Sequence, residues 1–223
     1  PPPPPRAGQL GMGGMQPVVD AATGALRDSP QALAERIDIG AVQRIAQDLQ
    51  LDDALPSELD GKIGIDAAWL SGLRLGGFKA YAEGGIRVDA GVTVAPGGSI
   101  ALHATQVDLN ADLTARGGSI ALGNMVGRLQ TGSTTNWLDQ PIAAVPPEGY
   151  TPGGTLAAGT TLDTRGLWTN LRTQPADIAG LPYLHGGSVS IASTGDLRLH
   201  AGSGIGTSSG AAVVGGGTLP GGR

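Results

Sequence analysis

The apolar and polar positions in the middle of the chain alternate with a period of two. Aliphatic residues occupy every second position in residues 100–102, 107–109 and 113–115. Because successive side chains of a strand point to opposite faces, each segment predicts a short strand with one apolar face. Glycines and small polar residues separate the three segments, which is typical of turns.

This three-strand unit is repeated along the chain. Residues 97–102 read GGSIAL, residues 117–122 read GGSIAL again, and residues 186–191 read GGSVSI. The first two copies begin 20 residues apart. Repeats of about this length are typical of folds in which each repeat buries its apolar face against its neighbours. We therefore expect an all-β fold, a right-handed parallel β-helix, which is a solenoid with three short strands per coil of about 20 residues.

The expected stacking is specific at the level of single residues. Ile100 is expected to stack on Ile120, and Leu102 on Leu122, with adjacent strands about 4.8 Å apart. Each buried aliphatic side chain would then contribute roughly 1.5–3 kcal/mol. The β-helix is expected over residues 61–215, with loop excursions near residues 130–165 and 172–185, where prolines interrupt the alternation.

The remaining segments have a different pattern. Residues 1–29 are interpreted as a Pro/Gly-rich linker, and residues 216–223 as a Gly-rich tail. Residues 30–60 predict a helical segment or cap, broken at Gly40. Ser29 suits the N-cap and Pro30 the first helical position. The expected apolar helix face comprises Leu33, Ile37, Val42, Ile45 and Leu49. This segment is either a partner-binding helix or a cap packed on the flank of the main fold.

Composition narrows the classes of function. The chain has three Trp, three Tyr and one Phe among 223 residues, which suits a narrow interior of small side chains. The net charge is −5 and lysine and arginine form no cluster, so we expect no nucleic-acid partner. No apolar run reaches the length of a membrane span, so none is expected. The chain opens on prolines without an initiator Met or a signal peptide, which we interpret as an internal piece of a longer protein.

The ordered series of repeats resembles a known family. Residues 86–122, 162–170, 186–191, 195–199 and 201–205 are together similar to the repeat region of filamentous haemagglutinin-like exoproteins of two-partner secretion systems. The resemblance implies a structural or adhesive shaft segment of a large bacterial exoprotein, with no enzymatic activity and no cofactor. It implies secretion through a dedicated outer-membrane pore, and release from or display on a Gram-negative cell. Host glycans or matrix proteins would be the partners. The chain has no Asn-Pro motif of the family's secretion-recognition domain, so it should not itself address the pore.

A second hypothesis is a polysaccharide-active β-helix enzyme, a lyase or a glycoside hydrolase. Asp108 and Asp112 should lie on the outer face, with a same-face spacing suited to an inverting carboxylate pair. Such a site needs a cation beside the carboxylates, and Arg87 is the nearest candidate in the preceding repeat. The alternative interpretation of the two carboxylates is a solvated polar face.

The remaining candidate residues are aromatic or histidine side chains. Trp137, Tyr150 and Tyr183 fall in the expected loops, where they could stack on sugars or anchor a protein, or fold back over the flank of the β-helix. The three histidines have no metal-ligand spacing, so we expect no metal site, and His103 should face outward. A third hypothesis is self-association through an uncapped end of the repeats, because unpaired strand edges can pair.

Overall fold

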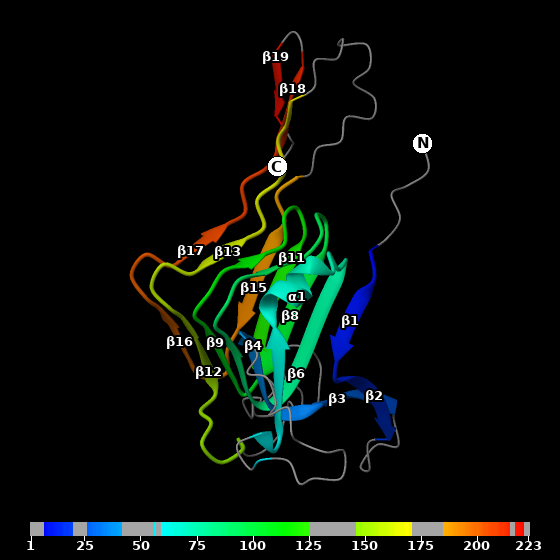
Figure 1. The fold of residues 1–223 in the computed structure, drawn as a ribbon, viewed down its shortest axis with the longest axis vertical. Helices are drawn as coiled ribbons and strands as arrows, with labels where there is room; N and C mark the ends of the chain where they lie inside the picture. The colour runs from blue at the N-terminus through cyan, green and yellow to red at the C-terminus, as the bar shows by residue number, and fades with distance from the viewer. Residues whose placement is uncertain are drawn as a thin grey trace.

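The computed structural model describes residues 7–19, 26–41, 56, 59–124, 146–170, 185–214 and 217–220, and most of them lie in β-strands (Figure 1). The strands are β1 (Gln9–Met12), β2 (Gly14–Val19), β3 (Leu26–Gln31), β4 (Ala34–Gly40), β5 (Lys62–Asp66), β6 (Gly77–Val88), β7 (Val92–Thr93), β8 (Ser99–Ala104), β9 (Gln106–Leu109), β10 (Leu113–Thr114), β11 (Ser119–Asn124), β12 (Gly153–Leu156), β13 (Thr161–Asp163), β14 (Thr169–Asn170), β15 (Ser188–Ala192), β16 (Asp196–Leu199), β17 (Gly204–Gly206), β18 (Ala211–Val214) and β19 (Gly217–Pro220). One described helix, α1 (Ala67–Gly72), lies between β5 and β6.

Two parallel sheets form the main body. The larger has ten strands, and its main path runs β15-β11-β8-β6-β9-β12-β16. It is curved and open like half a barrel (Figure 1). The smaller sheet has four strands in the order β17-β13-β10-β7. Two further groups contain antiparallel pairs, β2 with β3 and β18 with β19.

The expected all-β parallel β-helix with three short strands per coil is wrong. Strand β6 is 12 residues long; its first half pairs with β8 and its second half with β9. The strands on either side of β6, from β15 to β8 and from β9 to β16, therefore belong to one continuous open sheet. Because helix α1 lies between parallel strands in the chain, the arrangement is α/β-like. Alternation of apolar residues locates strands and their buried faces, but it does not determine whether one strand continues into the next or how a sheet closes.

The expected register between repeats is confirmed. Ile100 pairs with Ile120 and Leu102 with Leu122 in the parallel β8–β11 pair. The third copy continues the same columns, because β15 pairs in register with β11. The stacked layers bury an aliphatic core in which the fully buried aliphatic residues include Ile86, Ile100, Leu102, Leu109, Leu113, Ile120, Leu156 and Leu162.

The helix expected within residues 30–60 is wrong over its described part. Residues 30–40 contain the end of β3 and all of β4, and β4 is parallel to both β5 and β6. Ile37 and Ile39 are buried while Arg36 and Asp38 face outward, so this segment follows a period of two and not a helical period. Residues 42–55, 57 and 58, with Val42, Ile45 and Leu49, lie outside the described residues.

The helix that the structure contains is shorter and lies later in the chain. Asp66 caps α1, because its side chain accepts a hydrogen bond of 2.7 Å from the backbone N–H of Trp69. Leu70 is buried beneath the helix. The side of the helix toward the four-stranded sheet contacts β7 through Ser71, whose Oγ accepts a 3.0 Å hydrogen bond from the backbone N–H of Thr93.

Several segments interpreted as irregular contain strands. In the expected linker, β1 is parallel to β6, and β2 pairs with β3. In the expected loop of residues 130–165, β12 is a strand of the larger sheet, where it pairs with β9, and β13 is a strand of the smaller sheet, where it pairs with β10. Residues 125–145 and 171–184 lie outside the described residues. In the expected tail, β19 pairs with β18. No helix among the described residues is long and apolar enough to cross a membrane.

Candidate functional site

The outer face of the large sheet is polar, and its charges are paired along individual strands. Each of three neighbouring strands places a cation or amide two residues before an aspartate, which puts both side chains on the same face. The pairs are Arg36–Asp38 on β4 at 2.8 Å, Arg87–Asp89 at the end of β6 at 2.8 Å, and Gln106–Asp108 on β9 at 2.6 Å. Asn110 also donates to Asp89 at 2.7 Å. The hydrogen bonds from Asn110 and Arg87 lower the pKa of Asp89 below its ordinary value.

The structure places Asp108 and Asp112 in different surroundings. Asp108 is aligned with Arg87 across the β6–β9 pair, so the expected nearest cation does lie on the adjacent strand. The Arg87 guanidinium nevertheless forms its ion pair with Asp89. Asp112 lies between β9 and β10, where it accepts a 2.7 Å hydrogen bond from the backbone N–H of Thr161. Each of the two carboxylates thus accepts a hydrogen bond from within the chain, Asp108 from the Gln106 side chain and Asp112 from the Thr161 backbone.

Asp108 borders an open depression of about 580 Å³ on the outer face of β9, β12 and β16. Its charged and amide side chains are Gln106, Asp108, Asp196 and Arg198, and the rest of its lining is threonine, glycine and proline. Asp112 does not line it. The depression therefore combines two carboxylates and one guanidinium, but not the carboxylate pair that the sequence suggested.

Of the three aromatic binding candidates, the structure describes Tyr150. Its ring lies against the backbone of Gly84 and Gly85, where an added Cβ would overlap ring atoms. Burial, followed by the charge of Glu35, raises the pKa of the Tyr150 hydroxyl, which also hydrogen bonds with Glu35. Tyr150 thus covers the flank of β6 while staying partly exposed. Trp137 and Tyr183 lie outside the described residues.

His103 does not face solvent, contrary to the expectation. It is 4% exposed, and its ring stacks on Tyr81 with centroids 5.1 Å apart. Burial, with a smaller effect of Lys79, lowers the pKa of His103 from 6.5 to about 4. His185 and His200 are exposed. The described part of the chain contains no group of three or more His, Cys, Asp or Glu residues suited to a metal ion.

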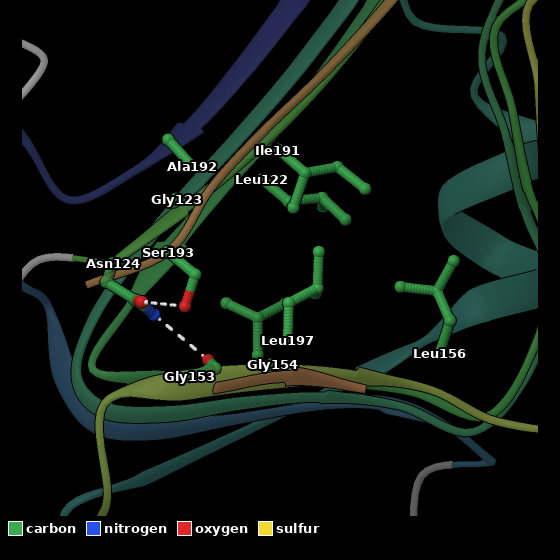
Figure 2. A pocket seen from close by; sticks show the side chains of 11 residues that line it. Leu122, Gly123, Asn124, Gly153, Gly154, Leu156, Ile191, Ala192, Ser193 and Leu197 are labelled. Carbon is green, nitrogen blue, oxygen red and sulfur yellow. Dashed lines mark hydrogen bonds between the residues drawn. The ribbon is translucent and has the colours of Figure 1, made fainter. Parts of the chain in front are cut away.

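A buried asparagine joins three successive layers at one corner (Figure 2). The Asn124 Nδ2 donates to the carbonyl oxygens of Ala104 at 3.2 Å, Thr105 at 2.8 Å and Gly153 at 3.0 Å. Its Oδ1 accepts from Ser193 Oγ and from the backbone N–H of Thr194, both at 2.8 Å. Sequence reasoning missed this residue. Its only signal was a lone polar residue two positions after the repeated GGSIAL segment.

A second missed cluster holds the four-stranded sheet. Asp163 is nearly buried and accepts hydrogen bonds from the Arg165 side chain at 2.8 and 3.0 Å, while the Arg116 guanidinium lies 3.1 Å away. The Arg165 hydrogen bonds come first among the causes that lower the pKa of Asp163. The Asp163 carboxylate is thus neutralised by two arginines of the same chain, and we interpret the cluster as stabilising the sheet.

A small void lies among described residues of β11, β12, β15 and β16. Gly154 lies between Val107 and Leu197 in the same column and contributes no side chain. A void of about 10 Å³ remains among Leu122, Leu156, Ile191 and Leu197 (Figure 2). A volume of this size approaches that of a single water molecule, so the void has no room for a ligand.

The chain was compared with known proteins and protein families in three ways. A scan against protein-family models and searches of curated proteins and solved structures found no match to this chain.

Proposed function

We propose that the chain is a structural and adhesive segment of a large bacterial exoprotein of the filamentous haemagglutinin type, secreted or displayed on the cell surface of a Gram-negative bacterium. Export through an outer-membrane pore and contact with host glycans or matrix proteins belong to the same proposal. The resemblance of the repeated segments to that family supports it.

The observation that carries this proposal is the in-register stacking of the repeated layers. Residues 99–104 pair one to one with residues 119–124, and residues 119–123 pair with residues 188–192. The three repeated strands therefore direct their aliphatic side chains into the same columns of the open sheet. Such a body suits a spacer whose outer surface and loops meet a partner.

The outer face fits a solvated shaft surface. Its charges are compensated on their own strands by pairs such as Arg36–Asp38 and Arg87–Asp89. A surface of interspersed charges resists association with other proteins over its length. Specific contacts would then come from aromatic residues outside these rows, for which Tyr150, Trp137 and Tyr183 are the candidates.

A binding array tests the adhesive function. The purified chain and a Trp137→Ala, Tyr150→Ala, Tyr183→Ala variant are applied to immobilised glycans and matrix proteins. We expect the chain to bind at least one class and the triple variant to lose that binding while keeping its circular dichroism spectrum. If neither protein binds, the adhesive part of the proposal fails and a purely structural segment remains.

The enzyme alternative has its own test, because the outer depression holds Asp108 beside Asp196 and Arg198. The chain is incubated with a panel of acidic polysaccharides, and unsaturated products and reducing ends are measured. Cleavage that disappears in Asp108→Asn would overturn the structural function. Asp89→Asn, outside the depression, is the matched control.

A further inference from the structure

The last layer of the stack leaves its inward-pointing apolar residues uncovered. This layer consists of β15, β16 and β17, each of which ends the main path of its sheet. Leu197 is 38% exposed, Leu199 52% and Ile205 49%. One layer below, Leu156 and Leu162 occupy the same columns as Leu199 and Ile205 and are 1% and 0% exposed. We call the surface formed by Val189, Ile191, Leu197, Leu199 and Ile205 the end face.

The opposite end of the stack is closed by the chain itself. Helix α1 packs on β4, β5 and β7 there. Ser71 accepts a hydrogen bond from the backbone N–H of Thr93 on β7, which is the last strand of the smaller sheet at that end. Ile65 and Leu70 at this end are 5% and 2% exposed. Among the described residues, α1 thus covers the aliphatic interior at this end, while its own Trp69 and the following Leu73 are 57% and 45% exposed.

The edge of β16 also exposes backbone groups. The N–H of His200 donates to the carbonyl oxygen of Leu156 on β12 at 3.0 Å. Because successive residues of a strand direct their N–H and C=O groups to opposite sides, Arg198 and Asp196 point toward β12 as well. The N–H and C=O groups of Leu197 and Leu199 consequently point away from the sheet, where an added strand would bind them.

The charges on β16 indicate which strand would fit. Asp196 and Arg198 flank Leu197 and are the most exposed of the paired charges, with side chains 88% and 72% exposed and 3.8 Å between them. In an antiparallel pair centred on Leu197, position 196 of one strand lies opposite position 198 of the other. The sequence Asp-Leu-Arg is therefore complementary in charge to a second copy of itself running in the opposite direction.

We propose that the end face binds a second copy of this chain, with β16 of both copies paired antiparallel about a two-fold axis at Leu197. The two Leu197 residues exchange both backbone hydrogen bonds, and each Asp196 faces Arg198 of the other copy at the closer, non-hydrogen-bonded positions. The same rotation brings the two end faces together, so their exposed leucines and isoleucines are covered mutually. The contact is isologous and stops at a dimer. The contact goes beyond the proposed function and concerns the chain of 223 residues.

A charge-swap experiment tests this geometry. Mass and dissociation constant are measured by sedimentation over a micromolar concentration series for the chain, Asp196→Arg, Arg198→Asp and the double swap. Each single change places like charges opposite each other twice, which weakens the dimer on the order of tenfold or more. The double swap restores opposite charges and should restore the dimer. Lys62→Asp, on β5 at the closed end, is the matched control and should leave the dimer unchanged.

The other outcomes overturn the proposal. A monomeric chain at every concentration means that no second copy binds the end face. Open-ended oligomers mean that copies add head to tail, and a dimer that ignores the charge changes or is weakened equally by Lys62→Asp uses another surface. Because both charged side chains are exposed, the variants should keep their fold, which circular dichroism checks.

Discussion

Replacing Asn124 by Asp tests whether one side chain joins the layers. The substitution keeps the shape of the side chain but exchanges an NH₂ group for a carboxylate oxygen. That oxygen would face the carbonyl oxygens of Ala104, Thr105 and Gly153, which now accept at 3.2, 2.8 and 3.0 Å. The acceptor contacts with Ser193 and Thr194 remain.

The magnitude follows from the loss of the NH₂ group that donates to these three carbonyl oxygens. Each net hydrogen bond is worth about 1 kcal/mol, and a buried polar group left without a partner costs about 1–3 kcal/mol. We expect the free energy of unfolding to fall by about 3–5 kcal/mol. For a chain of this size about 2–4 °C of Tm corresponds to each kcal/mol, so the Tm should fall by about 6–20 °C.

Thermal melting at neutral pH, followed by circular dichroism, measures this effect. Asn110→Asp is the matched control, since it makes the same change at an exposed residue whose amide donates to one side chain, Asp89. The new carboxylate would repel Asp89, but both side chains are exposed to solvent, so the cost should stay at about 1 kcal/mol. If the two variants melt at the same temperature, Asn124 does not stabilise the layers and the reasoning from its hydrogen bonds is refuted.

Two further predictions concern His103, which sequence analysis placed on the outer face, and Tyr150, for which it left both a binding role and a cover over the flank open. Because the pKa of His103 is lowered to about 4 from 6.5, the unfolded chain binds more protons between these values, and stability is lost as the pH falls through this window. Urea unfolding should show that His103→Phe loses about 2–3 kcal/mol less than the original chain between about pH 7 and pH 4.5; equal losses would contradict the buried neutral imidazole. An alanine at Gly84 would overlap the Tyr150 ring, so Gly84→Ala should destabilise by about 1–3 kcal/mol. In a Tyr150→Ala background the same change should be nearly neutral, and a double-mutant cycle with no coupling would show that the ring does not cover this glycine.

Local sequence patterns were informative where the repeats are regular. The alternation in residues 100–102 and 107–109 located β8 and β9, and the repeated GGSIAL segment determined the register of β8 on β11. A one-residue shift would move every aliphatic side chain to the outer face, so the pattern permits a single register. The charged positions between the aliphatic ones were likewise correctly interpreted as an outward face.

The apolar pattern predicted the wrong element where a local helical spacing competes with strand pairing in the folded structure. Residues 30–40 have apolar spacings compatible with a helix, but Ile37 and Ile39 are β-branched and find partners on β5 and β6. Pairing on both sides of β4 outweighs a weak helical preference. Residues 67–72 form a helix because Asp66 caps it, a local signal that a strand interpretation of the surrounding aliphatic residues concealed.

The sequence by itself determined which residues form the aliphatic columns and how successive repeats align, because side-chain alternation and repeat identity are local properties. Only the tertiary structure decided that β6 runs unbroken between the two sides of an open sheet, and that α1 closes one end of the stack while Leu197, Leu199 and Ile205 stay exposed at the other. It also brought Asn124 to the carbonyl oxygen of Thr105 in the preceding layer and to the hydroxyl of Ser193 in the next one, and Asp163 to Arg116. These contacts join residues distant in the chain, so their energies depend on how the sheet bends and where it ends, which no short sequence window contains.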